Sequence, residues 1–400
     1  MPFDLQSLIR PNIRNLEPYR CARDDFKEGI LLDANENTHG PALSTISSWE
    51  SALELNRYPD PHQVELKEQL ANFRNSTPNQ LIKSSTPKLQ SENMCLGVGS
   101  DESIDLLMRC VCTPGKDKLL VCPPTYGMYS ICATVNDLEM VSVPLTTPDF
   151  QIDVDAILKK VTEDPTIKLI YVTSPGNPTA KLIDPKLVVK LLEKALDSWN
   201  GLVVVDEAYI DFVDPVAPNS SQSVSTLVNQ FPNLVVLQTL SKSFGLAGVR
   251  LGITYASSAL SRYLNAMKYP YNISSLTSAV AVRSTQAEDG LKVMQNYVNE
   301  IKRDRAHLLE ALQKIPGVGK NIGGLDANFL LLQFLDLSGH PSNEVALELY
   351  NQLAVENGVV VRFRGKELNC KGALRLSIGT EEENKILIEK IGKILPSVRK

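Results

Sequence analysis

Lys242 lies in a segment whose residue types suit covalent chemistry on a carbonyl compound. It stands between Ser241 and Ser243, shortly after the apolar run 234–237, and Arg250 follows eight residues later. A primary amine in such a turn can form a Schiff base with a carbonyl group. The neighbouring guanidinium and hydroxyl groups can bind a phosphate monoester, because they donate hydrogen bonds to its oxygens. A solvated loop lysine without a chemical role is the alternative interpretation.

Three other polar clusters directly follow apolar runs that are typical of strands. They are Pro123-Pro-Thr-Tyr126, Ser174-Pro-Gly-Asn-Pro-Thr179 and Asp206-Glu-Ala-Tyr209. The carboxyl ends of parallel strands meet at one edge of a sheet, so these clusters and Lys242 are predicted to lie close together. Asp206 follows three valines, and a carboxylate at such low exposure needs a cationic partner to stay ionised. A helix cap or a structural ion pair is the alternative interpretation of Asp206.

A further candidate phosphate site is the segment from Cys95 to Asp105, where a short apolar run meets two glycines and then a helical pattern. Ser100 is predicted to cap this helix, and the free backbone N–H groups of its first turn can receive an anion. A purely steric need for the glycines is the alternative explanation.

The cysteines and histidines do not form a metal-binding pattern. The seven cysteines include no C-x-x-C pair, and the four histidines show no H-E-x-x-H spacing. We therefore expect no metal site, and we expect mainly buried, reduced thiols.

The elements that must position these groups alternate between strands and helices. We expect strands at 119–122, 139–143, 168–173, 202–205 and 234–237, and helices at 126–134, 154–161 and 185–198. Apolar strands separated by helical patterns indicate an α/β fold with a mostly parallel sheet covered by helices on both faces.

The length of 400 residues predicts about two or three domains. We expect an N-terminal arm (1–45) packing with the small domain, a large domain (46–283) and a small α+β domain (284–400). The small domain is predicted to contain helices at 290–315, at 343–357 and from 381, with strands at 329–334, 359–362 and 373–377. Arg362 and Arg375 fall in these strands, where they either bind an anion or reach out to water.

Charge and hydropathy exclude two classes of partner. The formal net charge of −5 gives no basic surface for nucleic acid. No apolar run is long enough to cross a membrane, and the first residues lack the pattern of a signal peptide. A cytoplasmic protein is expected.

The ordered motifs Ser174–Thr179, Asp206–Tyr209, Ser241-Lys242 and Arg250 resemble the fold-type I pyridoxal-phosphate aminotransferases of class I and II. Within that group, five segments resemble the histidinol-phosphate aminotransferases: 15–19, 32–37, 57–61, 124–129 and 374–380. The chain departs from the pattern at Ala180, where glycine is usual, and in two inserted polar segments, 75–93 and 214–225.

The resemblance implies a role for each matching residue. Lys242 would hold pyridoxal phosphate covalently and carry the substrate proton. Asp206 would pair with the pyridine nitrogen, and Asn177 and Tyr209 would bind the phenolic oxygen. Tyr126 would stack on the ring. The cofactor phosphate would contact Gly99, Ser100, Asp101, Glu102, Ser241 and Arg250, together with Tyr58 of a second subunit, which implies a homodimer.

The resemblance also implies the substrate and the groups that bind it. Arg362 and Arg375 would bind the anionic group, with Tyr19 and Tyr271 as hydroxyl donors. The implied reaction is transamination of L-histidinol phosphate with 2-oxoglutarate, giving L-glutamate. An aromatic amino-acid transaminase, a phospho-amino-acid decarboxylase, and a non-catalytic metabolite-binding protein on the same fold are the alternatives.

Overall fold

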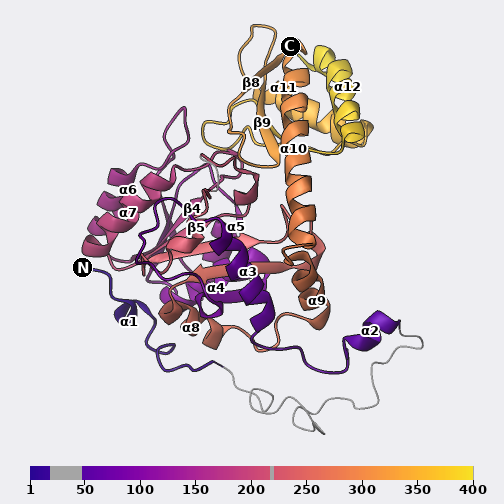
Figure 1. Cartoon of the computed structure of the whole chain (residues 1–400). Coiled ribbons are helices and arrows are strands. Elements are labelled where there is room, and N and C mark those ends of the chain that lie inside the picture. Colours follow the sequence, from indigo (N-terminus) through magenta and orange to yellow (C-terminus); the bar gives the residue numbers. More distant parts are fainter. Residues whose placement is uncertain (19–46, 217–219, 400) are drawn as a thin grey trace.

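The computed structural model describes residues 1–18, 47–216 and 220–399, and its largest element is a seven-stranded sheet (Figure 1). The strands are β1 (Met94–Val98), β2 (Lys118–Val121), β3 (Glu139–Ser142), β4 (Ile167–Thr173), β5 (Leu202–Asp206), β6 (Leu234–Thr239) and β7 (Leu251–Ala256). Their order is β1-β7-β6-β5-β4-β2-β3. Neighbouring strands from β6 to β3 are parallel, whereas β7 is antiparallel to both β6 and β1.

Helices cover both faces of this sheet. They are α3 (Val64–Ser76), α4 (Gly99–Val111), α5 (Met128–Val135), α6 (Val154–Glu163), α7 (Pro185–Ser198), α8 (Ser258–Met267) and α9 (Ser275–Ser284). Successive side chains of a strand point to opposite faces. In β4, Ile170 therefore packs with α6 and α7, whereas Leu169 packs with α4, α5 and α8. The predicted three-layer α/β architecture is confirmed.

The local sequence explains where these helices begin. Asp184 accepts a hydrogen bond from the backbone N–H of Lys186, and Pro185 occupies the first turn of α7, where its fixed φ suits a helix. The predicted cap at Ser100 is wrong, because α4 begins one residue earlier, at Gly99, after Val98. Strand β7 was not predicted, since Gly252 interrupts its apolar pattern.

A second sheet is formed by the C-terminal part of the chain. It contains β8 (Val318–Asn321), β9 (Phe329–Phe334), β10 (Arg362–Phe363) and β11 (Ala373–Ser377) in the antiparallel order β10-β11-β9-β8. It packs with α10 (Gly290–Gln313), α11 (Asn343–Asn351), the π-helical turn Gln352–Glu356 and α12 (Glu381–Val398). The α+β character is as predicted, but α11 is shorter than expected and the strand expected at 359–362 is reduced to β10. Strand β8 was not predicted.

The long helix α10 extends from the region of α9 to the second sheet (Figure 1). Met294 and Val298 on this helix pack in one apolar cluster with Tyr209 and Phe212 from the large sheet region and Phe329 from β9. The two sheets are therefore joined by a shared apolar contact. The boundary at 283/284 stays a prediction.

Residues 1–18 of the N-terminal arm pack on the large sheet region. The expected packing of the arm with the small domain stays a prediction, because residues 19–45 lie outside the described part of the chain. The described part of the arm carries α1 (Leu5–Leu8), and Leu8, Ile9 and Ile13 are buried beside α4 and α8. The backbone N–H of Arg10 donates to the carbonyl of Cys110 at 3.2 Å. A short helix, α2 (Ser48–Ala52), precedes α3. The sequence also predicts a short strand at 30–32, which lies outside the described residues.

The two inserted polar segments contact each other. The amide of Asn79 donates to the carbonyl of Ser223 at 3.2 Å, and Asn79 forms a bridge with Ser221. The Ser223 hydroxyl also donates to the Glu207 carboxylate at 2.6 Å, next to the end of β5, which ties the second segment to the large sheet. Across the ranges that the structure describes, no helix has the length and apolar character needed to cross a membrane.

Candidate active site

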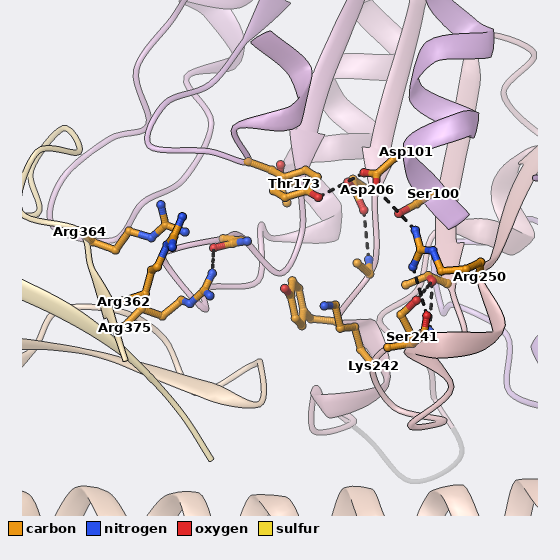
Figure 2. A pocket seen from close by; sticks show the side chains of 16 residues that line it. Ser100, Asp101, Thr173, Asp206, Ser241, Lys242, Arg250, Arg362, Arg364 and Arg375 are labelled. Atoms are coloured by element: carbon orange, nitrogen blue, oxygen red, sulfur yellow. Dashed lines mark hydrogen bonds and ion pairs between the residues drawn. The ribbon is translucent and has the colours of Figure 1, made fainter. Parts of the chain in front are cut away.

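A cavity of about 430 Å³ lies at the carboxyl ends of β4, β5 and β6 and is closed on one side by β10 and β11 (Figure 2). The chain brings most of the predicted site residues together here. The lining residues are Ser100, Asp101, Tyr126, Thr173, Asn177, Asp206, Ala208, Tyr209, Thr239, Ser241, Lys242, Ala247, Arg250, Arg362, Arg364 and Arg375.

Lys242 projects into the middle of the cavity from the turn after β6 (Figure 2). Its Nζ lies 5.7 Å from the centre of the Tyr209 ring. Burial, followed by the positive charge of Arg375, lowers the pKa of the Lys242 ammonium. A lowered pKa increases the fraction of neutral amine, which is the form that attacks a carbonyl group and accepts a proton.

Buried contacts hold the turn that carries Lys242. The hydroxyl of Ser243 donates to Oδ2 of Asp211 at 2.6 Å, and Oδ1 of Asp211 lies 2.7 Å from Nη1 of Arg74. Gly245 has a φ of +65° and its N–H donates to the carbonyl of Lys242, a backbone conformation that glycine adopts without strain. The main chain on the C-terminal side of Lys242 is therefore anchored to the interior.

Asp206 ends strand β5 and is 3 % exposed. Its Oδ2 accepts a 2.8 Å hydrogen bond from the hydroxyl of Tyr129, and its Oδ1 accepts one of 3.2 Å from the N–H of Ala208. Burial raises the pKa of Asp206 to about 6, against the hydrogen bond from Tyr129, which lowers it. The expected cationic partner is not found among the described residues, and a tyrosine hydroxyl stands in that place.

One end of the cavity is built to receive an anion. Ser100, Ser241 and Arg250 line it together with Asp101 (Figure 2). In α4 the backbone N–H of Gly99 donates to the carbonyl of Arg250 at 3.0 Å. The N–H groups that follow it in the first turn have no acceptor within the helix and can receive a ligand. Gly99 has a φ of +75°, and a Cβ at this position would collide with the guanidinium of Arg250. Glycine at 99 therefore lets Arg250 lie directly over the start of the helix.

Asp101 and Glu102 behave differently at this helix start. Oδ2 of Asp101 lies 3.8 Å from Nη2 of Arg250, and its Oδ1 accepts from Tyr126 at 3.2 Å. The Glu102 carboxylate instead accepts from the backbone N–H of Val98 and does not line the cavity. The Glu102 side chain therefore points away from the cavity, and only its backbone N–H is placed to bind a phosphate.

Asn177 and Tyr209 also line the cavity. The Asn177 Oδ1 accepts a 2.8 Å hydrogen bond from Nη1 of Arg375. The Tyr209 ring packs edge-on against Phe329, with ring centres 5.2 Å apart. Burial raises the pKa of Tyr209 to about 12, although the charge of Arg375 acts in the opposite direction. The tyrosine is therefore a neutral hydrogen-bond donor at physiological pH.

Three predicted tyrosines lie elsewhere or cannot be placed. The rings of Tyr58 and Tyr271 stack with centres 4.6 Å apart, and neither residue lines the cavity of its own chain. Tyr19 lies outside the described residues. Tyr126 lines the cavity, but its ring meets Tyr129 edge-on.

Sequence reasoning missed Tyr129, Thr173, Thr239 and Arg364. Tyr129 follows Tyr126 at helical spacing, and Arg364 follows Arg362 at strand spacing. These spacings were the available signals.

The structure describes six cysteines, which are all free and buried, as predicted; Cys21 lies outside this part of the chain. No group of three or more His, Cys, Asp or Glu side chains that could hold a metal is found in the described ranges.

Comparisons with known proteins show the family of the chain. Residues 27–391 match the family described as aminotransferase class I and II. The chain is 65% identical over 396 residues to the histidinol-phosphate aminotransferase of Candida maltosa, covering 99% of both chains. It is 53% identical to that of Saccharomyces cerevisiae, covering 97% of both.

Solved structures share the fold. The histidinol-phosphate aminotransferase of Sinorhizobium meliloti in complex with pyridoxal-5'-phosphate matches with a TM-score of 0.72 and 19% identity, over 91% of this chain and 90% of the other. The enzyme from Clostridium acetobutylicum matches with a TM-score of 0.69 and 21% identity, over 86% and 92%. The chain belongs to the class I and II aminotransferases and, within them, to the histidinol-phosphate aminotransferases.

Proposed function

We propose that this protein transfers the amino group of L-histidinol phosphate to 2-oxoglutarate, with pyridoxal phosphate as cofactor, giving imidazole acetol phosphate and L-glutamate. The observation that carries the proposal is the position of Lys242. Its partly buried amine lies in one cavity between a serine and arginine cluster at one end and three arginines at the other. An amine with anion-binding groups on two sides suits a phosphorylated cofactor and an anionic substrate together.

The residues of the cavity fit pyridoxal phosphate. The space over Gly99, which a Cβ would fill, is taken by Arg250, so a phosphate can contact the helix start and the guanidinium together. Asp206 is a buried carboxyl group at the base of the cavity, as a protonated ring nitrogen requires. When bound, the cofactor supplies the aldehyde that takes the amino group and a ring that stabilises negative charge on the substrate α-carbon.

Lys242 is proposed to move the substrate proton. Its lowered pKa favours the neutral amine, which can take the proton from the α-carbon of the bound amine substrate and later return it. Asp206 is proposed to hold a proton on the ring nitrogen, since a cation beside a buried carboxylate keeps that carboxylate ionised. Asn177 and Tyr209 are proposed to orient the ring through its phenolic oxygen.

The anion-binding residues are proposed to orient the two phosphates. Ser100, Ser241 and Arg250 would hold the cofactor phosphate, with the backbone N–H groups of Asp101 and Glu102. Arg362 and Arg375, at the opposite end of the cavity, would hold the phosphate of the first substrate and a carboxylate of glutamate in the second half-reaction. Each bound anion keeps the reacting carbon within reach of Lys242.

We propose that the protein is a homodimer in which Tyr58 contacts the cofactor phosphate of the partner subunit. Tyr58 is 53% exposed and does not line the cavity of its own chain, which is consistent with a role across an interface. Sedimentation of the purified protein tests the dimer.

The experiment that tests the proposed function is an absorbance titration of the purified protein. Adding L-histidinol phosphate without a keto acid should convert the cofactor to its amine form, and 2-oxoglutarate should restore the original spectrum. A preference for phenylalanine over L-histidinol phosphate would instead favour the aromatic transaminase. A protein that shows no spectral response to added cofactor or to either amine would contradict the enzymatic assignment.

A further inference from the structure

Three arginines share one face of the small sheet. Arg362 pairs directly with Arg375 in the antiparallel ladder of β10 and β11, and directly opposed residues point to the same face. Arg364 follows two residues later, and its N–H donates to the carbonyl of Ala373 at 2.9 Å, which continues the ladder. Because side chains alternate along a strand, Arg364 points to the same side as Arg362. Phe363 points the other way and packs on the apolar core of the small sheet.

The described residues neutralise these arginines only in part. Like charges placed opposite each other in a sheet repel. Burial, followed by the positive charge of Arg364, lowers the pKa of Arg375. In the described part of the chain, Nη1 of Arg364 lies 3.4 Å from one carboxylate oxygen of Glu367, which is itself 36% exposed. The two lining carboxylates, Asp101 and Asp206, lie on the far side of Lys242 (Figure 2).

Hydrogen-bond donors of these arginines also lack partners. The Nε atoms of Arg364 and Arg375 are both buried and find no hydrogen-bond partner among the described residues. A buried donor without a partner is costly, and a ligand oxygen in the cavity can relieve that cost. The guanidinium groups of Arg362, Arg364 and Arg375 lie close together at the end of the cavity opposite Arg250 (Figure 2).

The two substrates differ in how many donors they can use. A carboxylate has two oxygens and one negative charge, and one guanidinium can bind both oxygens. A phosphate monoester carries a charge of about −1.5 to −2 and three acceptor oxygens. A cluster of three guanidinium groups therefore exceeds what glutamate needs and matches what a phosphate ester offers.

We propose that Arg364 is a specificity-determining residue, which binds the phosphate group of L-histidinol phosphate and is not required for glutamate. This inference rests on the proposed function, because it assigns Arg364 to the phosphate end of that substrate. Arg375, which is anchored by Asn177 at 2.8 Å, is the arginine that both substrates share.

The test compares the two half-reactions in the Arg364→Gln holoenzyme. The concentration of L-histidinol phosphate that gives half the maximal rate should rise about 10- to 100-fold, as expected for loss of a charge-assisted hydrogen bond. The concentration of L-glutamate that gives half the maximal rate should change less than about threefold. The response to unphosphorylated L-histidinol should stay close to that of the wild type, because this amine has no phosphate group for Arg364 to bind.

Two further variants control the test. Lys366→Gln removes one positive charge from an exposed neighbour that does not line the cavity, and should leave both half-reactions unchanged. Arg364→Lys keeps the charge and loses the planar fork, so it should give a smaller rise in the same direction. This variant also provides the test should Arg364→Gln be poorly folded. Equal losses with L-glutamate and L-histidinol phosphate, or no loss with either, would overturn the proposal.

A second measurement separates this inference from the proposed function. Inorganic phosphate should inhibit the L-glutamate half-reaction of the wild-type holoenzyme, and Arg364→Gln should weaken that inhibition about tenfold or more. A wild type that fails to convert L-histidinol phosphate would refute the proposed function, while this inhibition still measures the anion site. Unchanged inhibition by phosphate in Arg364→Gln would refute the role of Arg364.

Discussion

The hydroxyl of Tyr129 lies 2.8 Å from Oδ2 of Asp206 and also 2.8 Å from the hydroxyl of Thr173. The Tyr129 proton is donated to the carboxylate, so the Thr173 hydroxyl donates to the tyrosine oxygen. Thr173 in turn lies 2.9 Å from the hydroxyl of Thr125. A chain of neutral hydroxyl groups thus supports the buried carboxylate in the absence of a cationic side chain.

Tyr129→Phe is expected to raise the pKa of Asp206 by about one unit, because it removes a hydrogen bond that favours the ionised form. In the holoenzyme, the acidic limb of the pH profile of kcat/KM should move to higher pH, and kcat should fall about tenfold at neutral pH. Tyr171→Phe is the control, since the Tyr171 hydroxyl bonds to the carbonyl of Ile104 and not to Asp206. An equal shift in both variants would contradict the role of the Tyr129 hydroxyl.

Glu207→Gln is expected to change how stability depends on pH. Burial raises the pKa of Glu207 to about 7 from the ordinary value of 4.5, against the hydrogen bond from Ser223, which lowers it. The folded protein therefore holds this proton to a higher pH than the unfolded chain does. The contribution of Glu207 to the free energy of unfolding falls as the pH rises through this window.

Relative to the wild type, Glu207→Gln should gain about 2 kcal/mol in free energy of unfolding between pH 5 and pH 8. Denaturant unfolding at the two pH values measures this change. Glu65→Gln removes an exposed carboxylate and controls for the loss of one charge. A constant difference between Glu207→Gln and the wild type at both pH values would show that Glu207 does not titrate in this window.

Gly99→Ala is expected to weaken cofactor binding about tenfold or more, since the new methyl group displaces the Arg250 guanidinium and a charge-assisted contact to phosphate is lost. A positive φ of +75° adds backbone strain. Fluorescence titration of the apoprotein with pyridoxal phosphate measures the dissociation constant. Gly127→Ala meets no atom within 4 Å and should bind the cofactor as the wild type does.

Lys242→Ala should purify without the visible absorbance of a lysine-linked cofactor, and turnover should fall by at least about 100-fold, the lower range for loss of a general base. Lys242→Arg, which keeps a positive charge but cannot form the link, should lose the absorbance as well. Normal turnover by either variant would contradict the proposed role of Lys242 in holding the cofactor and moving the substrate proton.

The sequence predicted most of the large sheet, because buried parallel strands are continuous apolar runs. Strand β5, with its three valines before Asp206, is an example. Strand β7 escaped prediction because Gly252 breaks its pattern, and only the structure shows that a Cβ there would collide with the backbone of Gly99. The close approach of the Gly99 backbone therefore requires glycine at position 252, and the local preference for a strand does not.

The sequence placed Lys242 and Asp206 at one edge of the sheet, and both line the cavity. It did not indicate contacts between residues that are distant in the chain. Lys242 and Asp206 could be found from their surroundings in the chain. Tyr129 meets Asp206 across 77 residues, and nothing in the helical pattern of α5 indicates that contact. The position of Arg364 beside Arg375 likewise follows from the pairing of β10 with β11. Strand β10 is shorter than the strand expected from the sequence, so the sequence pattern did not indicate this pairing.

The arginine face of β10 and β11 belongs to the small sheet, whereas Lys242 and Arg250 lie in the connection between β6 and β7 of the large sheet. The distance between the two groups of anion-binding residues therefore depends on how the two sheets pack together. They pack through the apolar cluster that contains Tyr209, Met294 and Phe329. Under the proposed function, this docking therefore also sets the distance between the phosphate of the cofactor and the anionic group of the substrate. Apolar residues that do not touch the substrate can thus influence which substrates fit, because they set the position of the small sheet relative to the large one.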